Sequence, residues 1–260
     1  MTTVTITSDW KYGDYYLGAL KGSLLSLSSG VRVVDITNSV PSFDVLQEIF
    51  ILKSTFLRFP LNSIHLMAVM SEPTPEKPMV IVYNTGHYFI GINDGRFSLL
   101  FDNLPSICFE ILSARTLPYS TFLALDLFRE GVRIILENRF ETETIAAELK
   151  KEYPTGVVNS ADSIVGRVIY CDSAGNAITN ITRELFDKLH QGRNYTIFVQ
   201  GPYTKINKIS RGYHDSNPGE VIALFNSLGM LELAVNQGNI TTLENLDTSS
   251  EIRIKFEKQL

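Results

Sequence analysis

The first candidate for chemistry is an aspartate that follows the first predicted strand. Residues 3–7, TVTIT, alternate and are β-branched, which favours a strand, and Ser8 and Asp9 come directly after them. Ligands of open α/β sheets bind at the carboxyl ends of the strands, where a carboxylate can accept two hydrogen bonds from a ribose diol. Capping of a turn explains Asp9 equally well at this stage.

A second group of polar residues follows a predicted strand far along the chain. Asp172 to Asn176 read D-S-A-G-N, in which Gly175 permits an unusual backbone angle and the Asn176 amide is both donor and acceptor. Such a group can read the edge of an adenine ring, although a hairpin turn is the simpler interpretation.

Two more turn-like segments flank the predicted strand MLELAV. Ser227 lies in the first and Gly238 in the second. Without a side chain, Gly238 would let backbone groups approach a flat ligand closely. Both segments are also explained as ordinary turns.

The remaining residues of reactive type form no recognised motif. The four histidines have no metal-ligand spacing, and the two cysteines, Cys108 and Cys171, form no C-x-x-C pair. The sequence contains no H-E-x-x-H, Walker A or G-x-S-x-G motif. We therefore predict no metal and no cofactor, and we expect reduced structural thiols.

The composition, with 44% hydrophobic and 20% charged residues, is that of an ordinary globular protein. The net charge of −5 and the lack of a basic run argue against nucleic acid and anionic membranes. No stretch approaches the roughly 20 apolar residues that span a bilayer, and the N-terminus does not resemble a signal peptide. We expect a soluble, cytoplasmic protein.

Alternating strands and helices must position Asp9. The pattern predicts strand 3–7, helix 14–28, strand 31–37, helix 44–57 and strand 63–70, in that order. A hairpin through Asn84-Thr85-Gly86 and a helix over about 120–138 follow. Such alternation implies parallel strands joined by crossover helices. We predict an α/β domain over residues 1–150, with a mostly parallel sheet and helices on both faces.

The pattern changes near Lys150. The following KEYPTGVVNSAD, residues 151–162, mixes charge, Pro, Gly and Ser without periodicity, which is typical of a linker. Beyond it come short strands separated by turn signals, as in a small β-barrel or sandwich. We assign an all-β barrel domain to residues 163–260.

Several segments, taken in order, resemble one protein family. They are Ser8-Asp9 with Asp14 to Gly22, Val40 to Val45, Ile64 to Leu66, Phe89 to Gly95, Asp172 to Ile181 and Gly219 to Asn239. Together they cover nearly the whole chain and resemble the fluorinase, chlorinase and hydroxide adenosyltransferase family, which acts on S-adenosylmethionine (SAM). The segments G-N-A-I-T-N-I and A-V-N-Q-G-N are the most specific.

The resemblance implies an N-terminal α/β domain, a C-terminal β-barrel and SAM as substrate or ligand. It also implies a homotrimer with the ligand between one subunit's N-domain and its neighbour's C-domain. The implied contacts are the ribose hydroxyls for Asp9, the ribose pocket for Phe43, adenine for Asn176 and the backbone near Gly238, and the methionine ammonium and carboxylate for Asp172 and Ser227.

The chain departs from the family where hydroxide-transferring members carry their polar residues. Those members have V-D-P-G-V-G after the third strand, and Met70 stands here in place of the aspartate. They also have T-F-H-G-R-D before a helix, and here Leu123 replaces the histidine and Leu125 the arginine. Glu72 and Lys77, in the same proline-rich segment as Met70, are the candidate catalytic residues that remain.

The family reaction displaces methionine from the ribose carbon that bears sulfur. Sulfonium leaves readily, so the protein has to position and desolvate a nucleophile. Water needs polar neighbours to orient it and to accept its proton, and leucine side chains do neither. We weigh three functions: a hydroxide adenosyltransferase of low activity with a rearranged nucleophile site, a non-catalytic adenosyl-ligand sensor or binding protein, and a halide-using relative.

Overall fold

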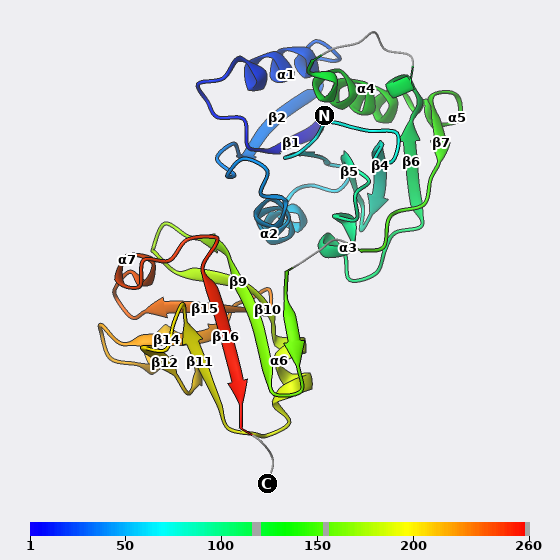
Figure 1. The fold of residues 1–260 in the computed structure, drawn as a ribbon. Coiled ribbons are helices and arrows are strands. Elements are labelled where there is room, and N and C mark those ends of the chain that lie inside the picture. Colours follow the sequence, from blue (N-terminus) through cyan, green and yellow to red (C-terminus); the bar gives the residue numbers. More distant parts are fainter. Residues whose placement is uncertain (116–120, 153–155, 258–260) are drawn as a thin grey trace. The chain divides into compact units, whose positions relative to one another are not determined.

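The computed structural model describes residues 1–115, 121–152 and 156–257 (Figure 1). The chain divides into two compact units, residues 1–153 and 154–260. No helix in these described ranges is long and apolar enough to cross a membrane.

Unit 1 is built on a seven-stranded sheet in the order β2-β1-β3-β5-β4-β6-β7. The first four strands of this order run parallel, and the last three continue it antiparallel. The strands are β1 (Thr2–Ser8), β2 (Val31–Thr37), β3 (Ile64–Ala68), β4 (Met79–Asn84), β5 (His87–Ile92), β6 (Ile107–Ile111) and β7 (Thr144–Ala146).

Helices cover both faces of this sheet. Leu66 of β3 belongs to the core that α1 and α4 close, whereas its neighbour Met67 belongs to the core under α2 and α3, because successive side chains of a strand point to opposite faces. The predicted arrangement of helices on both faces is therefore confirmed. The helices are α1 (Tyr15–Leu25), α2 (Val45–Thr55), α3 (Phe97–Leu100), α4 (Leu123–Glu137) and α5 (Phe140–Glu143).

Local sequence signals explain where several elements begin and end. Asp44 caps α2, and its carboxylate accepts the backbone N–H of Gln47 at 3.0 Å. Thr85 and Gly86 both have positive φ, 49° and 82°, as a two-residue hairpin turn between β4 and β5 requires. The predicted hairpin is confirmed.

Unit 2 is a single curled sheet in the order β12-β11-β16-β9-β10-β15-β14-β13, with β8 added beside β9. β12 near one end contacts β14 near the other, so the sheet forms a nearly closed barrel, as predicted. The strands are β8 (Val158–Ser160), β9 (Ser163–Cys171), β10 (Ala177–Thr182), β11 (Tyr195–Val199), β12 (Thr204–Ile206), β13 (Ile209–Ser210), β14 (Val221–Phe225), β15 (Met230–Val235) and β16 (Glu251–Phe256). Two helices accompany them, α6 (Arg183–His190) and α7 (Ile240–Leu243). β8 lies within the stretch predicted as linker.

Candidate functional site

A cleft of about 540 Å³ opens in unit 1 beyond the carboxyl ends of β1 and β3. The chain segments that follow these two strands form part of its wall, and the segments that lead into α1, α2 and α4 form the rest. This is the edge at which open α/β sheets bind ligands. The lining residues are Asp9, Trp10, Asp14, Tyr16, Ser42, Phe43, Met70, Ser71, Glu72 and Phe122.

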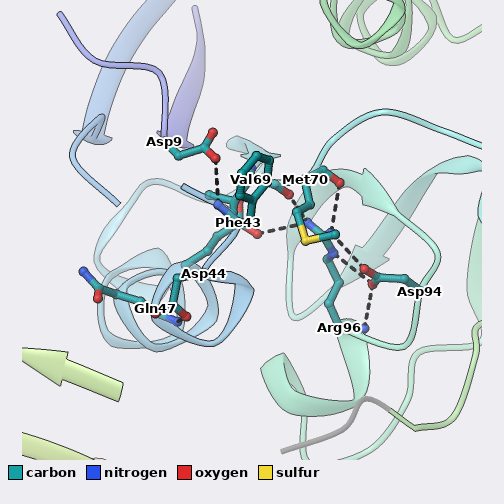
Figure 2. A network of polar contacts seen from close by, with 9 residues as sticks. Asp9, Phe43, Asp44, Gln47, Val69, Met70, Asp94 and Arg96 are labelled. Carbon is teal, nitrogen blue, oxygen red and sulfur yellow. Dashed lines mark hydrogen bonds and ion pairs between the residues drawn. The ribbon is translucent and has the colours of Figure 1, made fainter. Parts of the chain in front are cut away.

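Asp9 and Phe43, both predicted from the sequence, meet at this cleft. The Asp9 carboxylate accepts the backbone N–H of Phe43 at 3.1 Å through Oδ2 (Figure 2). Phe43 has a φ of 69°, in the left-handed region, and the residue is 72% exposed. Asp9 therefore fixes a turn and also lines a ligand-sized cleft, and its contact with ribose stays a prediction.

Three aromatic rings form one wall of the cleft. The Trp10 ring lies 4.8 Å from that of Phe122 and 6.4 Å from that of Tyr16, and Tyr16 lies 4.7 Å from Phe122, measured between centroids. Tilted and edge-on contacts are the geometry that aromatic pairs prefer, and all three residues line the cleft.

Glu72 is the candidate catalytic residue that the structure brings to the cleft. Although its side chain as a whole is exposed, partial burial of the carboxyl group raises the pKa of Glu72 above its usual value, and a hydrogen bond from the backbone of Ala124 opposes that rise. Ala124 lies in the first turn of α4, where unpaired N–H groups favour an anion. Lys77 does not line the cleft, and its backbone pairs with Thr74 instead.

The three positions that depart from the family pattern do not share one environment. Met70 lines the cleft and is 49% exposed. Leu123 and Leu125 are half-buried and pack against the core beneath α1 and α4, and neither lines the cleft. Phe122, the residue before them, contributes the aromatic ring.

The lining predicts the charge and shape of a ligand. It carries three carboxylates, from Asp9, Asp14 and Glu72, and four aromatic rings, and the described lining contains no lysine, arginine or histidine. Carboxylates attract a cation, and aromatic faces hold both a cation and a flat apolar ring. The cleft is thus suited to a cationic molecule with a flat ring system. No group of three or more His, Cys, Asp or Glu within the described ranges is arranged to hold a metal.

Comparison with known families agrees with this chemistry. Residues 4–145 match the SAM hydroxide adenosyltransferase N-terminal domain, and residues 166–253 match the C-terminal domain of the same family. The chain belongs to the SAM hydroxide adenosyltransferase family.

Several similar proteins align with nearly the whole chain. An (R)-S-adenosyl-L-methionine hydrolase from Methanocaldococcus jannaschii is 27% identical, over 97% of this chain and 95% of the relative. An uncharacterized conserved protein from Thermotoga maritima has the same fold, with a TM-score of 0.75 at 23% identity over 98% of this chain and all of that one. A conserved hypothetical protein from Thermus thermophilus aligns with a TM-score of 0.65 at 21% identity, over 98% of this chain and all of the other.

In unit 2, the predicted ligand residues Asp172 and Asn176 bind each other. Asp172 Oδ1 accepts the backbone N–H groups of Ala174 and Asn176, both at 2.9 Å, and Oδ2 accepts the Asn176 side-chain amide at 2.9 Å. The structure therefore confirms the hairpin-turn interpretation of this segment. A carboxylate has about four lone-pair positions, so Asp172 keeps capacity for a further donor.

Gly175 and Gly238 belong to adjoining loops of unit 2. The carbonyl oxygen of Gly175 accepts the backbone N–H groups of Ile240 and Thr241 at 3.1 and 3.2 Å, which joins the loop after β9 to the loop after β15. Asn176 and Gly238 thus lie on connected segments. Ser227 stands apart in the exposed β14–β15 turn, which Asn226 stabilises by accepting the N–H groups of Leu228 and Met230.

Sequence reasoning missed several residues that shape the cleft. Trp10 is the single tryptophan and directly follows Asp9, which was an available signal. Glu48 and Arg96 were also missed. The available signal for Glu48 was weaker: it is a charged residue inside the mostly apolar stretch VLQEIFIL. Their pairing joins positions far apart in the chain, and no local pattern predicts it.

Proposed function

We propose that this protein binds SAM in the cleft of unit 1 and transfers its adenosyl group to water, giving adenosine and methionine. The observation that carries the proposal is the lining of the cleft, which combines carboxylates and aromatic rings and suits a sulfonium cation joined to an adenosyl group. Membership of the SAM hydroxide adenosyltransferase family supports the same reaction.

The reaction requires one nucleophile and no external acid. The oxygen of water attacks the ribose carbon that bears sulfur, the carbon–sulfur bond breaks, and its electron pair neutralises the sulfonium to give the thioether of methionine. The proton of water passes to a base. We assign that role to Glu72, the one catalytic candidate that lines the cleft, because a carboxylate of raised pKa accepts a proton more readily than an ordinary one.

The other contacts follow from the position of each residue. Asp9 would accept the ribose hydroxyls, because its Oδ1 makes no hydrogen bond to any described residue and Oδ2 has one partner. Trp10, Tyr16 and Phe122 would hold the cation and exclude water. We expect slow turnover, because one carboxylate stands where the family has several polar groups and the loss of one oriented group typically costs about 3–4 kcal/mol.

Product analysis of two matched variants tests this assignment. Glu72→Gln should lower the rate of adenosine release by about 10²-fold, the contribution of a positioned base. Glu76→Gln, which alters an exposed carboxylate of the same segment that does not line the cleft, should leave the rate unchanged. Equal rates in both variants would exclude Glu72 as the base.

A non-catalytic sensor remains the second candidate, because polar family residues are replaced at positions 70, 123 and 125. Saturable SAM binding without adenosine, methionine or any other product would identify the protein as a sensor. Addition of chloride or fluoride to the same assay covers the halide-using alternative, which requires a halogenated adenosyl product.

We also propose that the protein assembles as a homotrimer in which the ligand is shared between subunits. The proposal is supported by the distribution of the predicted ligand residues over both units, with Asp9 and Phe43 in unit 1 and Asp172, Asn176 and Gly238 in unit 2. The number of subunits, three, is taken from the family that the sequence resembles.

A further inference from the structure

Two walls of the cleft use non-glycine residues in the left-handed backbone region. Phe43 has a φ of 69° and Met70 a φ of 46°, and both residues line the cleft. This conformation costs a non-glycine residue about 1–2 kcal/mol. It persists only where neighbouring groups hold it, so the contacts that hold these two residues bear on function.

The wall that contains Met70 is held from behind by buried charged side chains. β3 ends at Ala68, so the next peptide groups have left the ladder of the sheet. The Val69 N–H donates to Glu48 Oε1 at 2.9 Å. The Val69 carbonyl accepts Arg96 Nη1 at 2.9 Å, and the Met70 carbonyl accepts Arg96 Nη2 at 3.3 Å (Figure 2). Ser71 and Glu72 continue from this point along the cleft.

Arg96 binds both Glu48 and Asp94 in a buried cluster. Arg96 Nη1 donates to Glu48 Oε2 at 3.0 Å, and Arg96 Nε and Nη2 donate to the two Asp94 oxygens at 2.9 Å. The side chains of Arg96 and Glu48 are fully buried, and that of Asp94 is 8% exposed. Because desolvation offsets much of the attraction in a buried ion pair, stability alone is a weak reason for this arrangement, whereas a fixed geometry is a strong one.

Helix α2 connects this network with the other wall. Asp44 caps the helix directly after Phe43, and Glu48 lies one turn further along the same helix. The Asp9 carboxylate accepts the Phe43 N–H (Figure 2), and the Glu48 carboxylate accepts the Val69 N–H. The first turn of α2 therefore sets the spacing between the Phe43 wall and the Met70 wall.

We propose that Glu48, Arg96 and Asp94 form a positioning network that fixes the Met70–Glu72 wall of the cleft and thereby aims the Glu72 carboxylate. The network touches no ligand itself. The kinetic part of this inference rests on the proposed function, but the structural part does not.

Hydrogen exchange of backbone amides tests the structural part directly. Glu48→Gln keeps the shape of the side chain but turns one of its two acceptors into a donor, which then faces either the Val69 N–H or Arg96. We expect exchange at residues 69–72 to be at least about 10-fold faster while the rest of unit 1 keeps its protection. Arg96→Lys, which keeps the charge but loses the planar fork, should give the same local effect to a smaller extent.

The matched control changes Arg133, a second arginine that binds several carboxylates. Arg133 of α4 binds Glu130, Glu137 and Glu143, and it does not line the cleft. Arg133→Lys should leave exchange at residues 69–72 and SAM cleavage unchanged. In Glu48→Gln, kcat for adenosine release should fall by about 10–10²-fold with a smaller change in KM, because a displacement near 1 Å has that effect on a reacting group.

A pH profile adds a second readout of the contact between Glu48 and the Val69 N–H. The pKa of Glu48 is raised to about 8: burial is the largest cause, Asp9 and Asp94 add to the rise, and Arg96 and the Val69 N–H oppose it. The ionised form is the better acceptor, so protection of the Val69 amide should increase as pH rises through about 8 and should lose this dependence in Glu48→Gln.

Unchanged protection at residues 69–72 in both Glu48→Gln and Arg96→Lys would overturn the proposal. So would loss of protection throughout unit 1, which would mark the network as general scaffolding. If the natural chain does not cleave SAM, the proposed function fails, and the exchange measurements still decide whether the network positions the wall.

Discussion

At the scale of single residues, Asp9 offers the most direct test of ligand binding. Its carboxylate holds the Phe43 turn and lines the cleft. Asp9→Ala should weaken SAM binding by about 1.5–3 kcal/mol in calorimetry, the contribution of hydrogen bonds to a charged group. Asp102→Ala is the matched control, because the Asp102 side chain is 91% exposed and pairs with Lys53. Equal affinity in the two variants would show that Asp9 only stabilises the turn.

Met70 offers a test of the missing polar residues. Met70→Asp returns a carboxylate to the cleft at a left-handed position that aspartate tolerates better than methionine, and we expect cleavage about 10²-fold faster. Adding Leu123→His and Leu125→Arg should bring little further gain, because both leucines pack against the core. Adenosine release measured for the single and triple variants checks this, and a triple variant much faster than the single one would contradict it.

The candidate site was predictable where one short segment carries it. Asp9 and Phe43 follow from a strand-end aspartate and from the family resemblance, and the structure brings them together. The Glu48–Arg96 contact was not predictable, because it joins α2 to the segment before α3 and depends on how those elements pack. The sequence could not distinguish Glu72 from Lys77 as the catalytic candidate, because the path of a proline-rich segment cannot be derived from its composition.

At the scale of elements, two buried histidines link β1, β3 and β5. The Thr5 hydroxyl lies 2.7 Å from His65 Nδ1, and His65 Nε2 lies 3.2 Å from His87 Nδ1. Burial, with the charge of His87 as a smaller cause, lowers the pKa of His65 to about 3, and burial lowers that of His87 as well. Both rings are therefore neutral in the folded protein at neutral pH.

This histidine pair makes stability depend on pH. An unfolded histidine titrates at about 6.5, so below that pH the unfolded state binds more protons than the folded one. The stabilisation that depends on neutral His65 should be fully present above pH 6.5, and the free energy of unfolding should fall by up to about 1.4 kcal/mol per pH unit as pH drops towards 3. His87 should act in the same direction. Urea titrations should show a shallower slope for His65→Gln and an unchanged slope for His214→Gln, whose side chain is 89% exposed. An unchanged slope in His65→Gln would contradict this account.

The contact between two loops of unit 2 is a second test at this scale. Gly175 has a φ of 81°, and a Cβ there would lie 2.1 Å from Asn239 Cγ. Gly192 has a φ of 77°, and a Cβ at that position would meet no atom within 4 Å. Both alanine variants bear the left-handed penalty of about 1–2 kcal/mol, and Gly175→Ala should lose about 1–3 kcal/mol more through overpacking. Equal urea midpoints would contradict a tight junction of the two loops.

Elements were predictable in proportion to their length and periodicity. The predicted helix over 44–57 appears as α2 over Val45–Thr55, and the predicted strand over 31–37 appears as β2 over the same residues. β7 and β8, three residues each, were not predicted, because their strand geometry comes from pairing with β6 and β9 rather than from their own side chains.

At the scale of the whole molecule, the predicted ligand residues fall into two groups on separate units. We expect a homotrimer, because that assembly lets the two groups act on one ligand without requiring both from a single subunit. Sedimentation at micromolar concentration should give a species of three times 29.2 kDa. A stable monomer that binds SAM with undiminished affinity would contradict a shared site.

Ligand binding should also stabilise the assembled protein. A ligand that binds only the folded state at 100 times its Kd adds about 2.7 kcal/mol to the free energy of unfolding. SAM should therefore raise the Tm, and Asp9→Ala should reduce that rise while Asp102→Ala keeps it. A Tm that does not respond to SAM at any concentration would contradict binding.

Cleavage of SAM in water enriched in oxygen-18 tests the central claim most directly. If water attacks the ribose carbon that bears sulfur, the adenosine that accumulates above the protein-free control carries the heavy oxygen, and methionine appears in equal amount. The signal should be lost in Glu72→Gln and kept in Glu76→Gln. Adenosine without the label, or no adenosine from SAM after prolonged incubation with the folded natural protein, would contradict the assignment of hydroxide adenosyltransferase activity to this chain.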